Sequence, residues 1–276
     1  MKLIALDLDG TLFNNKSQIS RENIKAIKEA TAAGINVVIS TGRPFGGLPF
    51  EAIKDTGIRY AITANGSAIY EIETKKCLYE NCLSDETAFS ISDYLMTKRV
   101  HMDAFRNGCG YSPYKCLEDA KDLKMPPSIK EYIMTTRKRV NDITEMMREN
   151  NYHMQKMTIN FPKDVNDNYY CRDEVFEHLK KIPEITLVSG GYGNLEFTKA
   201  GVDKGVALHK LAQITNIAAD ETMAVGETDN DMAIVKAAHI GVAMGNATDE
   251  LKAQADYVTD TNENDGVAKA IRHFMG

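Results

Sequence analysis

The sequence predicts an α/β fold, a doubly wound parallel sheet of the Rossmann-like kind with a second α/β unit inserted into it. Short, largely apolar runs without charged residues are typical of strands that are buried on both faces of a parallel sheet. Stretches with apolar residues at helical spacing separate these runs, and polar residues gather where several runs end. The runs are Leu3–Leu6, Ile35–Ser40, Tyr60–Thr63, Thr222–Val225 and Ile240–Met244. A chain of 276 residues is long enough for one or two such domains.

The first part of the chain is predicted to form a strand–helix–strand unit followed by a hairpin. Ser20 precedes apolar residues at helical spacing, and Gly34 follows them where a helix commonly ends. A right-handed crossover then places the run that begins at Ile35 parallel to the first strand. Asn65-Gly66 is a strong turn signal and residues 67–71 continue as a strand, so a hairpin is expected there.

The middle of the chain, residues 84–189, is predicted to be the inserted unit, and residues 1–83 and 190–276 are predicted to form the core. Helical and strand-like patterns alternate in this middle part, which indicates an α/β unit of its own. Pro126-Pro127 and the Asn-rich residues 166–168 mark loops. The expected helices are 87–97, 140–150 and 173–181, and the expected strands are 157–161 and 185–188.

The core is expected to resume with a strand over residues 194–198. Asp203 is the expected N-cap of a helix over 204–214. Lys204 then lies in the first helical turn, where the helix dipole disfavours a cation, so an anion bound nearby would relieve the misfit. The later strands and a closing helix over 266–274 complete the doubly wound core.

The composition is ordinary for a globular protein, with 43% hydrophobic and 26% charged residues. A net charge of −6 argues against non-specific binding to nucleic acid. No stretch reaches the length of a membrane span and no signal-peptide pattern opens the chain, so a cytoplasmic protein without membrane partners is expected. The five cysteines show no CxxC pair and are expected to be reduced thiols.

Two carboxylates, Asp7 and Asp9, lie where the first strand ends. Ligands of open α/β sheets bind just beyond the carboxyl ends of the strands. Two like charges this close raise one pKa unless a cation neutralises them, so the pair implies a divalent metal or a shared proton. Hard oxygen ligands favour magnesium. Taken alone, the pair is equally well explained as a solvated Asp-Gly turn.

Polar residues also end the second predicted strand. The hydroxyl of Thr41 and the backbone N–H groups of Gly42 and Arg43 offer donors to an anion. Taken alone, Thr41 is better explained as a helix cap, and Arg43 as the partner of a surface acid.

An acidic loop follows the strand at 222–225. Acids that precede a helix favour its amino terminus, and this interpretation suits Asp229. We interpret Glu227 and Asp231 as metal ligands, because the carboxyl end of their strand brings them toward Asp7.

In combination, these segments resemble the haloacid dehalogenase superfamily of phosphotransferases and, within it, the Cof-type (subfamily IIB) sugar-phosphatase-like group. The family's motifs are Asp-x-Asp-Gly-Thr, a Ser or Thr that closes the second strand, a Lys that opens a late helix, and Gly-Asp-x-x-Asn-Asp. They are matched in order by Asp7–Thr11, Thr41, Lys204 and, imperfectly, Gly226–Asp231. The resemblance spans nearly the whole chain and implies that residues 84–189 are a cap domain that carries substrate specificity.

The resemblance implies a phosphoric monoester hydrolase for small phosphorylated metabolites, either sugar phosphates or a phosphorylated cofactor. Asp7 is then the nucleophile that forms an aspartyl-phosphate, and Asp9 is the general acid and later the general base. The implied phosphate- or substrate-binding residues are Leu8, Thr41, Gly42, Arg43, Asn65, Lys204 and Asn230. Mg2+, with Mn2+ as an alternative, is implied to bind Asp7, Asp9 through its backbone carbonyl, Glu227 and Asp231.

Glu227 departs from the family pattern, which has aspartate at this position. One extra methylene moves the carboxylate by about 1.5 Å, and magnesium demands near-ideal octahedral geometry. A catalytically weak phospho-metabolite binding protein, with Glu227 as the lesion, is therefore an alternative. A phosphomutase of the same superfamily, which would retain both acids, is another. A dehalogenase is disfavoured, because that class lacks an acid at the position of Asp9. The sequence specifies neither the substrate nor the oligomeric state.

Overall fold

The computed structural model describes residues 1–150, 153–190 and 193–276 and contains two compact units. Unit 1 comprises residues 1–43, 48–80 and 202–276. Unit 2 comprises residues 44–47 and 81–201. In the described part of the chain, no helix is long and apolar enough to cross a membrane.

Unit 1 is built on an eight-stranded sheet in the order β14-β13-β12-β1-β2-β3-β4-β5. The strands from β14 through β3 are parallel, whereas β4 and β5 are antiparallel. Its strands are β1 (Leu3–Leu6), β2 (Asn36–Ser40), β3 (Tyr60–Thr63), β4 (Ala68–Glu71), β5 (Cys77–Glu80), β12 (Thr222–Gly226), β13 (Ile240–Ala243) and β14 (Tyr257–Val258). Because β1 lies between β2 and β12, the strand order reverses beside it, which is where ligands of such sheets bind.

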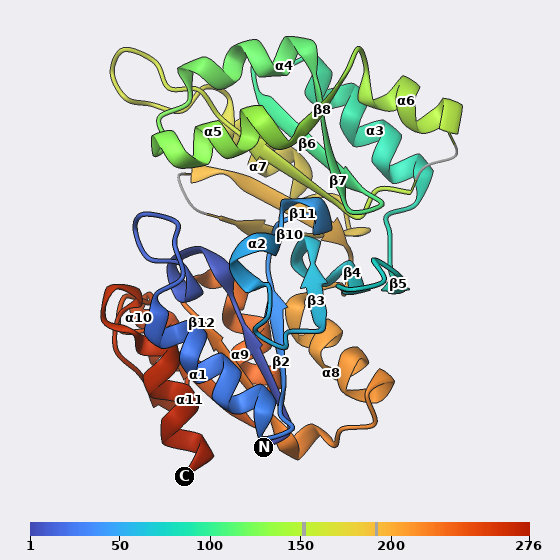
Figure 1. The fold of residues 1–276 in the computed structure, drawn as a ribbon. Coiled ribbons are helices and arrows are strands. Elements are labelled where there is room, and N and C mark those ends of the chain that lie inside the picture. The colour runs from blue at the N-terminus through green and yellow to red at the C-terminus, as the bar shows by residue number, and fades with distance from the viewer. Residues whose placement is uncertain (151–152, 191–192) are drawn as a thin grey trace. The chain divides into compact units, whose positions relative to one another are not determined.

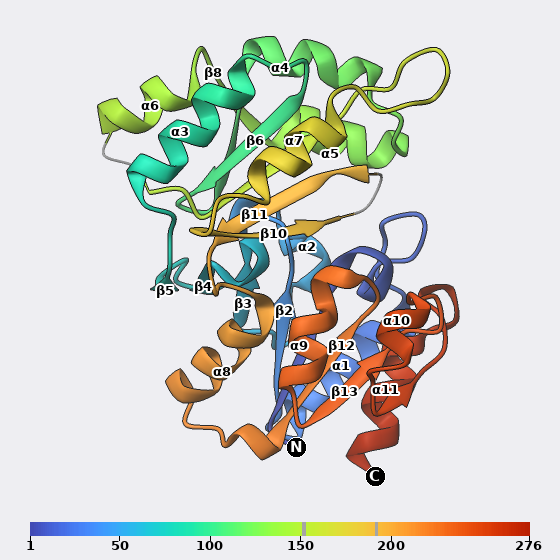
Figure 2. The ribbon, with the colours of Figure 1, turned by 180° about the vertical axis from the view of Figure 1, so that it is seen from behind.

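Helices cover both faces of this sheet. On one face α1 packs with α11, and on the other α8 packs with α9 (Figures 1 and 2). The helices of unit 1 are α1 (Arg21–Ala32), α2 (Phe50–Ile53), α8 (Lys204–Ile214), α9 (Met232–Ala237), α10 (Asp249–Lys252) and α11 (Gly266–Met275). The predicted α/β, doubly wound fold is confirmed.

The local signals in the sequence explain these elements. All four residues of β1 are buried, as expected for a central strand with helices on both faces. The hydroxyl of Ser20 accepts a hydrogen bond from the N–H of Asn23 and caps α1, and Gly34 ends that helix with φ +84°. Asn65-Gly66 lies in the loop of the predicted hairpin between β3 and β4.

Unit 2 contains a six-stranded sheet in the order β10-β11-β9-β6-β7-β8, which is antiparallel except between β7 and β8. Its strands are β6 (His101–Arg106), β7 (Cys109–Pro113), β8 (Arg137–Val140), β9 (Lys156–Asn160), β10 (Ile185–Ser189) and β11 (Leu195–Lys199). Its helices are α3 (Asp85–Met96), α4 (Tyr114–Asp119), α5 (Pro127–Thr136), α6 (Ile143–Asn150) and α7 (Arg172–Leu179).

The strands of unit 2 alternate between an apolar and a polar side. Met102, Met157 and Phe197 are buried in a core with residues of α3, α6 and α7. The residues next to these in the strands point to the other side and form ion pairs there. Lys156, beside Met157, pairs with Glu196, beside Phe197, and the distance from Nζ to Oε2 is 2.6 Å. This period of two is typical of a sheet that packs helices on one face.

Two details of the sequence prediction were wrong. Residues 194–198 were expected in the core sheet, but β11 pairs with β9 and β10, so unit 2 extends to Gly201 rather than to residue 189. Apolar runs alone do not tell which sheet a strand joins. The helix expected over 140–150 begins only at Ile143, because Val140 ends β8, which pairs with β7.

Candidate active site

The chain leaves β1 in a turn closed by two hydrogen bonds that each span five residues, with Asp9 and Gly10 in non-helical backbone conformations. The N–H of Leu12 donates to the carbonyl oxygen of Asp7 at 3.2 Å, and Phe13 N–H donates to Leu8 at 2.8 Å. Turns with this spacing of five residues are rare and are frequent at functional sites. Leu8 is completely buried and anchors the turn. Asp7 is buried, whereas the side chain of Asp9 is 51% exposed.

Lys204 joins two strand ends through its ammonium group. Its Nζ donates to Asp7 Oδ1 at 2.8 Å and to Asp231 Oδ1 at 2.6 Å, and its own side chain is fully buried. Asp203 caps the helix as predicted, because its Oδ1 accepts from the N–H of Val206 at 2.8 Å. Two carboxylates of the chain itself therefore compensate the lysine that the helix dipole disfavours.

Asp231 holds the acidic loop in place. Its Oδ2 accepts hydrogen bonds from the backbone N–H groups of Glu227 at 2.9 Å and Thr228 at 3.3 Å. Its Oδ1 is held by Lys204, so both oxygens of this buried carboxylate are engaged. Asp229, which we interpreted as an acid that favours a helix amino terminus, is exposed and lies in the first turn of a short helix before α9.

Glu227 lies against Gly10. A Cβ atom built on Gly10 would be 2.7 Å from Glu227 Cδ and 2.8 Å from Oε1, so the missing side chain makes room for the longer acid. Among the described residues, nothing donates a hydrogen bond to the Glu227 carboxylate or to Asp7 Oδ2. The negative charge on these oxygens is therefore not paired with a hydrogen-bond donor of the described residues.

Burial and like charges dominate the electrostatics of this cluster. Burial, followed by the charge of Asp231, raises the pKa of Asp7 to about 7, although Lys204 opposes the shift. Burial, followed by the charge of Asp7, raises the pKa of Glu227 to about 8. Burial alone would lower the pKa of Lys204, but Asp231 and Asp7 outweigh it and raise this pKa. Three carboxyl groups thus face one ammonium group, and the excess negative charge suits a divalent cation.

The donor set also suits magnesium. Within residues 1–150, 153–190 and 193–276, no three His, Cys, Asp or Glu side chains are grouped so as to hold a metal by themselves. Magnesium is commonly bound through one or two carboxylates, with water in its other positions. Asp7 Oδ2 and the carboxylate oxygens of Glu227, which accept no hydrogen bond from the described residues, fit that requirement.

Arg43 pairs with Asp9. Its Nη2 donates to Asp9 Oδ1 at 2.6 Å and its Nε donates to Oδ2 at 2.8 Å, and the guanidinium carbon lies 5.2 Å from the Phe13 ring centroid. The alternative that we gave for Arg43, a partner of a surface acid, is therefore the arrangement found here.

The remaining predicted residues lie at the ends of neighbouring strands. Thr41 is buried beyond β2, and its Oγ1 accepts from the N–H of Arg43 at 3.2 Å, so this N–H is already used within the chain. Gly42 lies between them in sequence. Asn65 is buried, and its N–H donates to the carbonyl oxygen of Thr41 at 3.2 Å. Asn230 lies in the acidic loop, where its Oδ1 accepts from the Thr228 hydroxyl at 2.6 Å.

Two asparagines that the sequence interpretation missed support the first motif. Asn246 Nδ2 donates to the carbonyl oxygen of Gly10 at 2.8 Å, and Asn262 Nδ2 donates to that of Phe13 at 2.9 Å. The N–H of Asn262 in turn donates to Asn246 Oδ1 at 2.9 Å. Asn246 closely follows β13, the neighbour of β12, so its place at a strand end was the signal that could have identified it.

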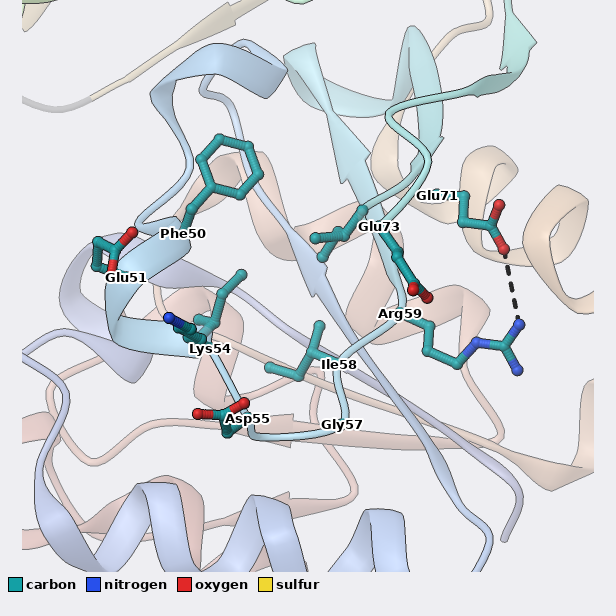
Figure 3. A pocket seen from close by; sticks show the side chains of 11 residues that line it. Phe50, Glu51, Lys54, Asp55, Gly57, Ile58, Arg59, Glu71 and Glu73 are labelled. Carbon is teal, nitrogen blue, oxygen red and sulfur yellow. Dashed lines mark ion pairs between the residues drawn. The ribbon is translucent and has the colours of Figure 1, made fainter.

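A separate hollow of about 510 Å³ lies beside α2 in unit 1 (Figure 3). It is lined by side chains of both charges. They include Glu51, Lys54 and the ion pair of Arg59 with Glu71, in which nitrogen and oxygen are 3.6 Å apart. None of the predicted site residues lines it, so we do not assign it a part in the chemistry.

Comparison with known proteins identifies the family of the chain. A family model described as haloacid dehalogenase-like hydrolase matches residues 4–271. The 5-amino-6-(5-phospho-D-ribitylamino)uracil phosphatase YcsE of Bacillus subtilis is 34% identical over all of this chain and 96% of its own length. A solved structure of a haloacid dehalogenase-like hydrolase from B. subtilis has a TM-score of 0.85 and 31% identity over 99% of both chains. The subclass IIB sugar phosphatase BT4131 shares the fold, with a TM-score of 0.80 and 24% identity over 100% of this chain and 99% of its own.

Proposed function

Because the chain belongs to the haloacid dehalogenase-like hydrolases, in their Cof-type group, we propose that it is a magnesium-dependent phosphatase of small phosphorylated metabolites. The resemblance drawn from the four motifs and the prediction of an enzyme of this family are confirmed. The observation that carries the proposal is the Lys204 ammonium group, which contacts Asp7 at 2.8 Å and Asp231 at 2.6 Å. It supports the convergence of the first, third and fourth motifs on one point.

Asp7 is the proposed nucleophile. Its Oδ1 is fixed by Lys204, which orients the carboxylate and leaves Oδ2 to attack the phosphorus of the substrate. The new bond joins the Asp7 carboxylate to phosphorus, and the bond from phosphorus to the ester oxygen breaks. A bound magnesium ion would supply positive charge that lowers the repulsion between the carboxylate and the phosphoryl group.

Asp9 is the proposed acid and base. It gives a proton to the leaving ester oxygen, and the resulting carboxylate then takes a proton from the water that attacks the aspartyl-phosphate. In the structure Arg43 holds Asp9 by two hydrogen bonds, and the side chain of Asp9 is half-exposed. Proton transfer therefore requires the Asp9 carboxyl group to leave Arg43 and turn toward the bound ester.

Two groups are proposed to stabilise the charge that develops on the phosphoryl oxygens. Lys204 supplies a buried ammonium group, and Thr41 supplies its hydroxyl, which accepts from Arg43 N–H and keeps its own hydrogen to donate. We keep Leu8, Gly42, Arg43, Asn65 and Asn230 as proposed contacts.

The metal is proposed to bind the carboxylate of Glu227, the backbone carbonyl of Asp9 and Asp7 through Oδ1, the oxygen that does not attack the phosphorus. Asp231 stays a proposed ligand, because its three hydrogen bonds leave one of the roughly four lone-pair sites of a carboxylate open. It also holds Lys204 and the loop that carries Glu227. The Glu227 carboxyl group occupies the space that a side chain at position 10 would take, so Gly10 accommodates the longer acid.

The proposed substrate is a small phosphate monoester of the kind that the relative's name states, a phosphorylated ribityl compound, or a sugar phosphate. The experiment is phosphate release from a panel of such esters and from an aryl phosphate, with magnesium and with a chelator. We expect turnover that requires magnesium and falls by about 10³-fold or more in Asp7→Asn. Equal rates for Asp7→Asn and the unaltered protein would reject Asp7 as nucleophile. Transfer of phosphate to a second sugar hydroxyl instead of water would identify a phosphomutase.

A further inference from the structure

Three consecutive residues in the loop after β3 have left-handed backbone angles. The φ values of Ala64, Asn65 and Gly66 are +50°, +55° and +98°. Glycine adopts this region without strain and asparagine tolerates it, whereas an alanine there is uncommon. Ala64 is completely buried and Asn65 nearly so, so no solvent-exposed turn chemistry explains the conformation. Strain of this kind persists only where the surrounding structure holds it, and it concentrates at functional sites.

One side of this loop is bonded to the end of β2. The N–H of Ala64 donates to the carbonyl oxygen of Arg43 at 2.9 Å, and the N–H of Asn65 donates to that of Thr41 at 3.2 Å. The left-handed turn therefore takes its position from the segment that carries the second motif.

The other side of the loop contacts the first residues of α8. A Cβ atom built on Gly66 would lie 2.1 Å from the carbonyl oxygen of Asp203 and 3.0 Å from the nitrogen of Lys204. These are backbone atoms at the start of a capped helix, so they cannot move aside as a flexible side chain would.

A second glycine directly follows the same lysine. A Cβ atom built on Gly205 would lie 2.5 Å from the carbonyl oxygen of Ala233, in the helix α9 that follows the acidic loop. The backbone at Lys204 therefore has a close contact to the loop after β3 through Gly66 and a second close contact to α9 through Gly205.

We infer that Gly66 and Gly205 are positioning residues that fix the Lys204 ammonium group at its place between the acids and the bound phosphate. The inference rests on the proposed function in one respect, that Lys204 binds phosphate. The ammonium group is within hydrogen-bond distance of two carboxylates at once, at 2.8 and 2.6 Å, which leaves little room for a shift of the helix. A methyl group in either contact displaces the start of α8 and moves the ammonium group off both partners.

The test compares glycine-to-alanine substitutions by their affinity for inorganic phosphate in the presence of magnesium. Gly34→Ala is the matched control for Gly66→Ala, because Gly34 has φ +84° and nothing lies within 4 Å of a Cβ built on it. Both variants place an alanine at a positive φ, but only the alanine at position 66 collides with the backbone of Asp203. We expect Gly66→Ala to bind phosphate about tenfold or more weakly than Gly34→Ala. Gly205→Ala, for which no positive φ arises, is expected to show a similar loss.

The same substitutions are then made in a Lys204→Met background. If the glycines act through Lys204, Gly66→Ala should weaken phosphate binding by less than about twofold once Lys204 is already replaced, because the effects of interacting residues are not additive. Equal losses with and without Lys204 would overturn the inference, as would equal affinities of Gly66→Ala and Gly34→Ala. A variant that unfolds is replaced by Gly205→Ala in the same cycle.

The outcomes for the function and for the positioning role are separate. An unaltered protein that binds phosphate but hydrolyses no ester contradicts the proposed function, and a non-additive cycle in that protein still supports the positioning role. An unaltered protein that binds no phosphate contradicts both.

Discussion

Replacement of Glu227 by glutamine is predicted to stabilise the metal-free protein, although it removes a proposed ligand. The pKa of Glu227 is raised from 4.5 to about 8 in the folded chain, first by burial and then by Asp7 and Asp231. Between these two pH values the folded state holds more protons than the unfolded state, so stability falls as the pH rises from about 4.5 through 8. Glutamine cannot ionise and avoids this loss.

The size of the effect follows from the same values. Complete ionisation of a group whose pKa rises from 4.5 to about 8 costs about 5 kcal/mol at high pH. Glu227 is only partly buried, and solvent screening reduces the expected gain of Glu227→Gln to about 2–3 kcal/mol at pH 8. At pH 5 the gain should be below about 1 kcal/mol.

The assay is urea unfolding between pH 5 and 9 with a chelator, and again with magnesium. Asp229→Asn is the control, because it makes the same change of charge at an exposed position of the same loop. Magnesium should stabilise the unaltered protein, since ligand binding to the folded state adds stability, and should stabilise Glu227→Gln much less. A loss of stability in Glu227→Gln with chelator at pH 8, or a gain independent of pH, would refute the reasoning.

Three further substitutions test neighbouring parts of the site. Lys204→Met leaves two buried carboxylates without their cation and should lower the unfolding free energy of the metal-free protein by about 3–5 kcal/mol in urea at pH 8; an unchanged midpoint would contradict the buried ion pairs. Asn246→Ala removes the hydrogen bond to the carbonyl of Gly10 and should cost about 1 kcal/mol in the same assay and weaken magnesium binding by calorimetry; unaltered stability and affinity would show that the contact supports nothing. Glu227→Asp should keep or raise magnesium-dependent turnover, and a large loss would mean that the acidic loop is misassigned.

The sequence could place the candidate site residues at strand ends, because each follows a strand that can be identified by its apolar run. Parallel strands place their carboxyl ends at one edge of a sheet, which is why Asp7, Thr41 and Glu227 were expected near one another, and their roles stay predictions. The cap of α8 by Asp203 was equally readable, because it depends on adjacent residues.

The side-chain partners were less predictable, because they depend on distances that spacing does not contain. The sequence indicated an external anion for Lys204, whereas Asp7 and Asp231 are its partners. From the sequence we expected a raised pKa for one of the two crowded acids of the first motif. In the structure the pKa is raised for Asp7 and also for Glu227, in both cases mainly by burial. The assignment of β11 to the second sheet also depends on long-range pairing that an apolar run does not encode.

The central claim is that Asp7 forms a covalent bond to phosphorus, and rapid quenching tests it most directly. The unaltered protein is mixed with magnesium and a ³²P-labelled substrate identified by the panel, quenched in acid within milliseconds, and digested. The account predicts label on the peptide that contains Asp7, at no more than one phosphate per chain, and none in Asp7→Asn. Turnover of the substrate without label on that peptide would contradict it.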